Sequence, residues 1–173
     1  MIRRPPRSTQ GVSSAASDVY KRQIFIGLIN VNGQPKVIEY NVRMGDPETE
    51  AVLPRIKNDL LEIFQTFKDK NLNSINLSID ERTAATVMLV SGGYPEKYQK
   101  NIQIHGLNDI KNSLVFHAGS KYENGSIYTN GGRVLAITSL GQNLEFALKS
   151  SYESASKISF EGMYYRKDIG FDL

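Results

Sequence analysis

The sequence predicts an α+β protein built in two parts. The first part is a strand pair followed by a helix, and the second is a small β-rich domain with one packed helix. Two observations lead to this expectation. Apolar residues alternate in short runs separated by Gly- and Asn-containing turns, and they change to helical spacing in only two segments. The hydrophobic content of 40% is sufficient for a packed core.

The strand pair is expected at residues 24–31 and 35–42, whose sequences are IFIGLINV and PKVIEYNV. Both runs alternate apolar and polar side chains, which is typical of half-buried strands. Asn32 and Gly33 lie between them, and an Asn-Gly pair favours the tight turn of a β-hairpin. We therefore predict an antiparallel hairpin at the beginning of the first part.

A helix is expected after the hairpin. Asp46 is suited to cap its first turn and Pro47 to occupy its first helical position. The apolar side chains that follow keep roughly helical spacing as far as Lys68: Val52, Leu53, Ile56, Leu60, Leu61, Ile63 and Phe64. Residues 71–82 are polar and rich in turn formers, so we expect a linker there.

The second part is predicted to be mostly β-structure with a single helix. Its expected elements are strands at 83–93, 101–104, 113–120, 126–130 and 133–141, a helix at 143–158, and a final strand or extended segment at 160–170. We interpret Gly92-Gly93 as a turn that follows a strand. We interpret Asn130-Gly131-Gly132 as a hairpin turn in preference to an anion-binding nest.

The amino-acid composition excludes several classes of protein. The chain has no Cys, so it forms neither disulfides nor thiolate metal sites, and we expect a cytoplasmic location. No apolar run approaches the ~18 residues of a membrane-spanning helix, so no membrane partner is expected. Residues 1–23 hold five of the 21 Lys and Arg residues and one of the 18 acidic residues. The remaining body, with 16 basic and 17 acidic side chains, is nearly neutral, and nucleic acid is not an expected partner.

Residues 1–23 are rich in Arg and Ser, and two origins fit them. Their composition is typical of an organellar transit peptide, although Pro5-Pro6 interrupts any amphipathic helix. The segment also resembles the translated read-through of a sequencing adaptor, which is the interpretation we favour. In either case we expect a disordered leader outside the fold, and we expect the chain to be a fragment whose native part begins near Ile24.

One face of the second predicted strand carries Glu39, Asn41 and, one step further, Arg43. Residues two apart on a strand lie roughly 6.6 Å apart on one face, so Glu39 and Asn41 can bind one ion, or two ions bridged by phosphate. A carboxylate and an amide oxygen suit Mg²⁺ or Mn²⁺, and a guanidinium suits a phosphate or carboxylate. From spacing alone we favour a simpler interpretation, a solvent-facing strand with a Glu39–Arg43 ion pair.

Longer segments of the sequence resemble the phosphoribosylamine–glycine ligase family of ATP-grasp enzymes, also called glycinamide ribonucleotide synthetases. The resemblance begins with KVIEYNVRMGDPETE and continues through LPRIKNDLLEI, VSGGYPEKY, IHGL, VFHAGSK, TNGGRVLAITSLG and YYRKDIG. Each short motif is weak by itself. The ordered set is specific, and it covers residues 24–170.

The resemblance implies a function and assigns roles to residues. In this family a Glu-x-Asn element holds the divalent cations that bridge the ATP phosphates, which corresponds to Glu39 and Asn41. The implied reaction joins glycine to 5-phosphoribosylamine through glycyl phosphate, consumes ATP and belongs to purine biosynthesis. The implied cofactor is Mg²⁺ or Mn²⁺. Arg43 is a candidate catalytic or substrate-binding residue, and Asp46 is a candidate substrate contact.

The same resemblance implies the domain organisation. Residues 24–70 correspond to the end of an ATP-grasp domain, 71–82 to a linker and 83–173 to the carboxyl-terminal domain. The amino-terminal part of such a ligase is missing, including its adenine-binding residues, so we expect this chain alone to be inactive. Two alternatives stay open: another ATP-grasp carboxylate–amine ligase, and a non-catalytic ligand-binding or assembly module.

Overall fold

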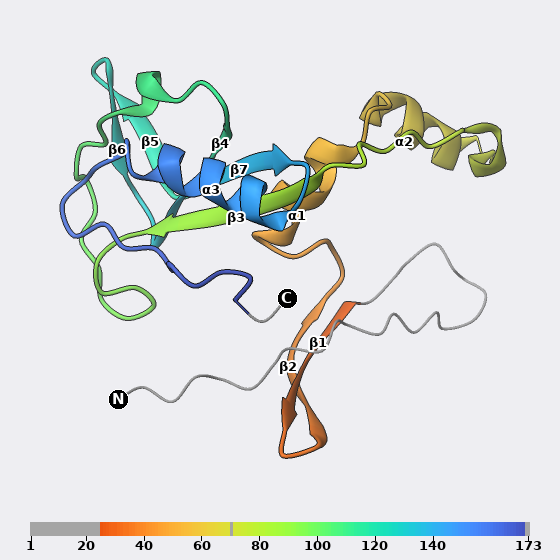
Figure 1. Cartoon of the computed structure of the whole chain (residues 1–173), viewed down its shortest axis with the longest axis horizontal. Helices are drawn as coiled ribbons and strands as arrows, with labels where there is room; N and C mark the ends of the chain where they lie inside the picture. Colours follow the sequence, from red (N-terminus) through yellow and green to blue (C-terminus); the bar gives the residue numbers. More distant parts are fainter. Residues whose placement is uncertain (1–24, 70, 172–173) are drawn as a thin grey trace. The chain divides into compact units, whose positions relative to one another are not determined.

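The structure is a computed structural model that describes residues 25–69 and 71–171 (Figure 1). The predicted leader at 1–23 lies outside these residues. The described part divides into two units, a β-hairpin region that ends at Asp46 and a larger unit from Pro47 to Phe171. Its antiparallel strands and α-helices confirm the predicted α+β class.

The predicted hairpin is confirmed. Strand β1 (Phe25–Val31) pairs antiparallel with β2 (Gln34–Asn41). Asn32 and Gly33 connect them in left-handed conformations with φ of 52° and 84°, as a type I′ turn requires. Asn30 Oδ1 accepts a hydrogen bond from Gly33 N at 2.8 Å and stabilises the turn.

The larger unit contains helices, short 3₁₀ turns and two further sheets. In chain order its elements are α1 (Glu48–Val52), η1 (Leu53–Arg55), α2 (Leu60–Lys68), η2 (Leu72–Ser74), β3 (Thr83–Val90), η3 (Leu107–Asp109), β4 (Leu114–His117), β5 (Ser120–Glu123), β6 (Ser126–Thr129), β7 (Arg133–Gly141) and α3 (Leu144–Ala155). No helix in the described part of the chain is long and apolar enough to cross a membrane.

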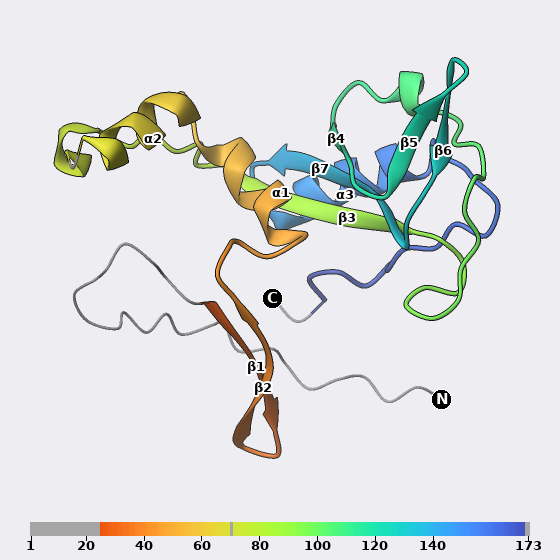
Figure 2. The same ribbon diagram turned by 180° about the vertical axis from the view of Figure 1, so that it is seen from behind.

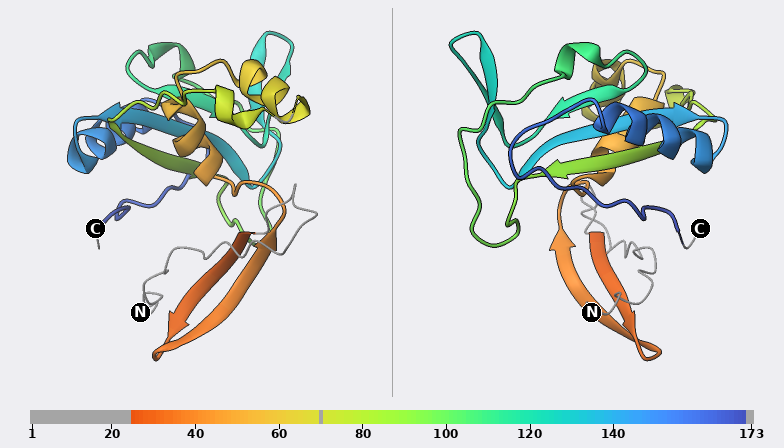
Figure 3. Two further views of the ribbon diagram at one scale, coloured as in Figure 1. Left: turned by 90° about the vertical axis from the view of Figure 1, so that its right-hand side faces the viewer. Right: turned by 60° about the vertical axis from the view of Figure 1, so that its left-hand side comes forward.

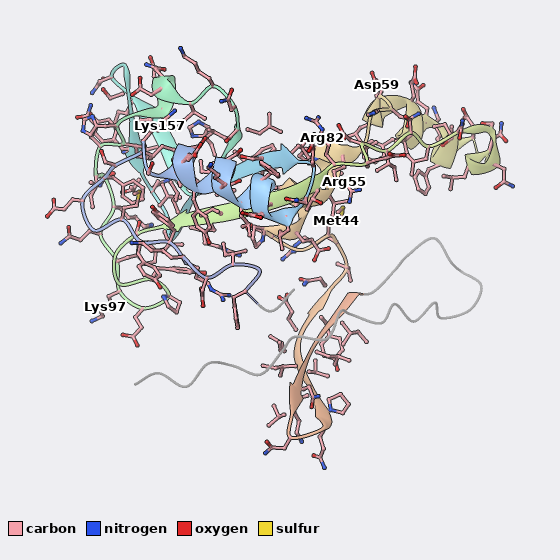
Figure 4. All side chains as sticks on the ribbon, viewed as in Figure 1. Met44, Arg55, Asp59, Arg82, Lys97 and Lys157 are labelled. Carbon is pink, nitrogen blue, oxygen red and sulfur yellow. The ribbon has the colours of Figure 1, made fainter. Side chains whose placement is uncertain are left out.

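The single helix expected after the hairpin is wrong, because the chain forms α1, η1 and α2 instead. Pro54 has no N–H group to donate to the preceding turn, which ends regular helix. Ile56 is then extended, with ψ of 119°. A new helix begins at Leu60, where Asp59 Oδ1 accepts a hydrogen bond from Leu61 N at 2.7 Å (Figure 4).

Asp46 does not cap α1, contrary to expectation. The residue at the capping position is Pro47, and no side chain makes a capping hydrogen bond there. Residues 46 and 47 form a turn, so the helix begins at Glu48. A capping side chain must lie directly before the first helical residue to reach its free N–H groups, and Asp46 lies one residue too early.

Residues 71–82 are held against the segment that precedes α2. Arg55 Nε donates a hydrogen bond to Asp80 O at 3.0 Å (Figure 4). Lys57 N donates to Ser78 O at 2.9 Å. The domain division that the sequence suggests at 71–82 stays a prediction.

The core of the larger unit is a three-stranded antiparallel sheet in the order β3-β7-β4. Figures 1 and 2 show α3 on one face of this sheet and α1 on the opposite face, and both helices contact β3 and β7. Residues 134–139 of the central strand β7 are all buried, because neighbours cover both its edges and both its faces. The core cluster consists of Val87, Leu89, Ile104, Val134, Leu135, Ile137, Ala155, Ile158 and Phe160.

The predicted helix at 143–158 is confirmed as α3. Asn143 is its N-cap, and its side-chain oxygen accepts a hydrogen bond from Phe146 N at 3.0 Å. The side chains that α3 buries include Ala147 and Ala155, as expected, and also Ser151, whose Oγ donates to Ala85 O at 2.9 Å. Helix and sheet are therefore joined by a buried hydrogen bond as well as by apolar contacts.

A hairpin turn at residues 130–132 was expected, and this expectation is wrong. Strand β6 pairs with β5 in a separate two-stranded sheet, whereas β7 lies in the three-stranded sheet (Figure 3). The turn between β5 and β6 is formed instead by Asn124 and Gly125, with φ of 49° and 81°. Gly132 serves a different purpose, since any Cβ there would overlap the ring of Tyr94.

The strand expected at 101–104 is also wrong. This segment forms an isolated bridge between Gln103 and Tyr128 and backbone hydrogen bonds to β6, such as Ile104 N to Ile127 O at 2.8 Å, but it is not a regular strand. Residues 160–170 were expected to be a strand or an extended segment, but they are irregular, with turns at 161–162 and 169–170 and a bridge between Tyr164 and Val90. Both segments lie beside the main sheets without joining them as full strands.

Candidate metal centre

Strand β2 presents Glu39 and Asn41 on the same face. Their Cα partners in β1 are Gly27 and Phe25, and the register between these pairs is regular. Alternate residues of a regular strand point the same way and lie about 6.6 Å apart. A β-bulge after Gly27 leaves Ile38 without a Cα partner, so the irregularity falls just outside the stretch that carries the two side chains.

The two side chains differ in their surroundings. Glu39 is exposed. Asn41 is only 7% exposed, and its Nδ2 amide has no hydrogen-bond partner among the described residues. An unsatisfied buried polar group costs about 1–3 kcal/mol, and a carboxamide can turn to present either its oxygen or its nitrogen. Asn41 is therefore a buried polar side chain with unused capacity to bind a ligand.

The donor set fits a hard divalent cation, but only in part. A carboxylate and a carboxamide oxygen are ligands that Mg²⁺ and Mn²⁺ accept. In the described part of the chain, His, Cys, Asp and Glu form no group of three or more that could hold a metal. Mg²⁺ is commonly held by one or two protein ligands, with water and phosphate oxygens in the other positions. Glu39 and Asn41 fit that arrangement, in which a phosphate substrate completes the coordination.

A glycine lies directly opposite the glutamate. A Cβ added to Gly27 would lie 3.1 Å from Glu39 Cγ. Glycine inside a strand is destabilising by about 0.5–1 kcal/mol relative to alanine, and it often marks a close approach. Sequence reasoning overlooked Gly27, although a lone glycine in the run IFIGLINV was a usable signal.

Arg43 and Asp46 are not brought to the two metal candidates by strand geometry. β2 ends at Asn41, so alternation does not extend to Arg43. Arg43 Nη1 donates a hydrogen bond to Met44 O at 2.7 Å. Asp46 is exposed in the turn before α1. Their assignment as substrate contacts stays a prediction.

The apolar side of β2 is exposed within the described part of the chain. Ile38, Tyr40 and Val42 are 60%, 67% and 84% exposed. The sequence pattern indicated a half-buried strand with its apolar face inward. The structure shows the reverse at this end of the hairpin, where the polar Asn41 is buried and the apolar residues beside it are not.

A hollow of about 430 Å³ lies in the larger unit, and it contains none of the predicted site residues. It is lined by Gly92, Lys97, Tyr98, Gln99, Ile102, Glu161 and Gly162. The first and last of these lie in close contact, since a Cβ on Gly92 would lie 2.7 Å from Gly162 O. This close contact explains why position 92 is a glycine, without any bound phosphate.

An ion pair near the beginning of β3 joins Asp80 to Arg82 (Figure 4). Arg82 Nη2 lies 2.7 Å from Asp80 Oδ2. Hydrogen bonds from the Arg82 side chain and backbone hold the pKa of Asp80 well below its usual range, and the same pairing raises the pKa of Arg82. The Arg82 side chain is 53% exposed, so the pair lies at the surface and stabilises the entry to β3.

The fold defines the chain as an α+β protein in which helices lie on both faces of an antiparallel sheet. The family model described as "Phosphoribosylglycinamide synthetase, C domain" matches residues 84–172, just over half of the chain. The chain belongs to this family.

Relatives agree with this assignment. A phosphoribosylamine–glycine ligase from Caldanaerobacter subterraneus is 44% identical over 151 residues, which cover 87% of this chain and 36% of the relative. A bifunctional purine biosynthetic protein from Schizosaccharomyces pombe is 43% identical over 148 residues, covering 84% of this chain and 19% of the relative. The crystal structure of phosphoribosylamine–glycine ligase from Thermotoga maritima matches with a TM-score of 0.64 and 34% identity, over 84% of this chain and 36% of that one. The chain thus spans about a third of the length of the ligases it matches.

Proposed function

We propose that the chain is the carboxyl-terminal part of an ATP-dependent phosphoribosylamine–glycine ligase in which Glu39 and Asn41 bind Mg²⁺ or Mn²⁺. One observation carries the proposal: β2 presents on a single face an exposed carboxylate and a buried carboxamide whose Nδ2 has no hydrogen-bond partner among the described residues. The names of the relatives support the ligase reaction. The partial donor set supports a site that a phosphate substrate completes.

The proposed reaction brings two anions together, glycine carboxylate and the γ-phosphate of ATP. A bound divalent cation would supply positive charge that offsets their repulsion. Glu39 would contribute a charged ligand from a solvent-facing position. Asn41 would contribute a neutral ligand from a buried position, where little side-chain freedom is left to lose on binding.

The remaining parts of the proposal concern substrates and organisation. Glycyl phosphate would react with 5-phosphoribosylamine to give glycinamide ribonucleotide. We propose Arg43 as a catalytic or substrate contact and Asp46 as a substrate contact. Residues 24–70 would complete an ATP-grasp domain and 83–173 would form the carboxyl-terminal domain. A cytoplasmic location is part of the same proposal.

A chimera tests the metal roles. In it, residues 25–173 replace the corresponding part of the Caldanaerobacter ligase, and glycine-dependent ADP release is measured against Mg²⁺ or Mn²⁺ concentration. Glu39→Ala and Asn41→Ala should each reduce the rate at least about 100-fold, because metal ligation is worth several kcal/mol in the transition state.

Controls in the same chimera separate this result from general damage. Glu153→Ala and Asn108→Ala remove the same side-chain types from exposed positions of the larger unit and should leave the rate unchanged. Equal rates for the site variants and the controls would overturn the metal assignment. A panel of amine acceptors would distinguish this ligase from another carboxylate–amine ligase, since only 5-phosphoribosylamine should be used efficiently.

The chain by itself should neither bind ATP tightly nor release ADP. Its candidate ligands provide part of a metal site, and the relatives extend far beyond the region it spans. Isothermal titration with ATP and Mg²⁺ should therefore show no tight binding. Glycine-dependent ADP release from the purified chain would contradict this expectation.

A further inference from the structure

Gly27 and Glu39 face each other across the hairpin as direct Cα partners. A Cβ built on Gly27 would lie 3.1 Å from Glu39 Cγ, and 3.8 Å from both the backbone N and O of Glu39. The backbone distances are ordinary van der Waals contacts. The contact with Cγ is too close, so the side chain of Glu39 occupies the space that glycine leaves open.

Backbone conformation does not explain this glycine. The described glycines with positive φ are Gly33, Gly93, Gly106, Gly125, Gly162 and Gly170, and Gly27 is not among them. The β-bulge that follows Gly27 does not explain it either, because the bulge type that selects glycine uses a left-handed residue. Alanine could adopt the backbone of Gly27 without strain and would favour the strand. The structure leaves one reason for a glycine at position 27, which is the space that the Glu39 side chain needs.

A methyl group at this position would act on the direction of the carboxylate. Cγ is the second side-chain atom of Glu39, and it moves away from a fixed neighbour mainly by rotation about χ1. The contact is relieved when Cγ moves by a few tenths of an ångström. Turning χ1 away from its staggered minimum costs energy, so the population of this exposed side chain shifts toward other rotamers. The carboxylate lies at the end of the side chain and would move furthest.

We propose that Gly27 is a positioning residue that leaves room for the rotamer of Glu39 seen in the structure, in which Cγ lies against the glycine. The inference rests on the proposed function, because it assigns this rotamer to cation binding. Gly27 itself contacts no substrate and contributes no ligand. Because it has no side chain of its own, Gly27 leaves free the space that the Glu39 side chain occupies.

The first test uses the 173-residue chain without metal. Three-bond NMR couplings give the χ1 rotamer populations of Glu39 in the original chain and in Gly27→Ala. The rotamer populations should shift in the variant, while melting temperature stays equal or rises. Val31→Ala, at the far end of β1, is the control and should leave the Glu39 couplings unchanged. An unchanged rotamer in Gly27→Ala would overturn the proposal, whatever the function.

The second test uses the ligase chimera and Mn²⁺ as the probe. Changes to residues that orient metal ligands typically reduce metal affinity 10–100-fold. Gly27→Ala should therefore raise the Mn²⁺ dissociation constant, measured by electron paramagnetic resonance, at least about 10-fold. The rate at saturating Mn²⁺ should change much less than this. A double variant that also carries Glu39→Ala should bind Mn²⁺ no more weakly than Glu39→Ala alone.

The outcomes distinguish the two hypotheses. A changed rotamer with unchanged Mn²⁺ affinity, while Glu39→Ala binds weakly, would overturn the positioning role and keep the proposed function. Unchanged affinity in both single variants would instead overturn the metal assignment of Glu39, and the positioning role with it. Weaker binding by Gly27→Ala in the Glu39→Ala background would show an effect that does not pass through Glu39, which also overturns the inference.

Discussion

The hairpin and the three-stranded sheet are both antiparallel, yet they distribute their side chains in opposite ways. In β7, residues 134–139 are all buried, and Leu135 and Ile137 are 0% exposed. In β2, residues 34–40 are all exposed and only Asn41 is buried. The sheet buries its apolar residues, whereas the hairpin buries a polar one.

This difference indicates that the larger unit provides stability, whereas the hairpin carries the candidate ligands. Full burial of a Leu or Ile side chain contributes roughly 1.5–3 kcal/mol, and every buried apolar side chain in the described residues belongs to the larger unit. The candidate ligands belong to the hairpin. Substitutions in the sheet should therefore change the free energy of unfolding, and substitutions in the hairpin should mainly change ligand binding.

The largest expected contrast comes from removing one side chain in each region. Leu135→Ala should lower the free energy of unfolding by about 2–5 kcal/mol, because it leaves a cavity in the centre of the sheet. Val42→Ala removes a side chain that is 84% exposed and should change it by no more than about 0.5 kcal/mol. Urea denaturation followed by circular dichroism measures both. Similar losses for the two variants would contradict the claim that the sheet, and not the hairpin, determines stability.

Replacing a glycine in each region should also affect stability differently. Gly132→Ala should destabilise the larger unit by about 1–3 kcal/mol, because the new Cβ overlaps the Tyr94 ring and forces it to move. Gly27→Ala meets a flexible side chain in the hairpin and should leave stability equal or slightly higher. Thermal unfolding of the two variants checks this. A destabilised Gly27→Ala would mean that Gly27 has a structural role in the hairpin.

Removing a helix cap should have a smaller effect on stability, and this effect should again depend on where the helix lies. Asn143→Ala removes the cap of α3, which packs on the main sheet, and should lower stability by about 1 kcal/mol. Asp59→Ala removes the cap of α2, whose Leu61, Phe64 and Phe67 are exposed. That change should fray α2 without affecting global unfolding. Amide hydrogen exchange resolves the two cases, and equal effects would show that α2 unfolds together with the core.

The smallest expected effect is the pH dependence of the Asp80–Arg82 pair. The pKa of Asp80 is lower in the folded than in the unfolded protein, so its contribution is complete above the unfolded pKa of about 3.9. It is lost as pH falls through the lower folded pKa. Asp80→Asn should therefore reduce stability slightly at pH 6, and by progressively less as pH falls below about 4. A larger loss at low pH than at neutral pH would have the wrong sign.

Local signals in the sequence predicted the local structure well. Asn32-Gly33 specified the first hairpin, and Asn143 with the apolar spacing after it specified α3. Other local signals were present and misjudged. Pro54 and Asp59 divide the expected helix in two, and Asn124-Gly125 has the same turn chemistry as the first hairpin.

Pairing between distant segments could not be predicted in the same way. The sequence does not show that β6 and β7 join different sheets, because that choice depends on which strands compete for each edge. Strand alternation placed Glu39 and Asn41 on one face, but their proposed role came from family resemblance. The burial of Asn41 and the space left by Gly27 depend on cross-strand register, which single-sequence patterns do not fix.

Strands β1 and β2 form a two-stranded sheet in the described part of the chain, so each has one outer edge without a neighbouring strand. Such edges can pair with another polypeptide, and exposed apolar side chains beside them strengthen that tendency. Self-association of this chain should therefore increase as its concentration rises. Dilute samples would stay monodisperse, and turbidity would begin with contacts between hairpins of neighbouring copies.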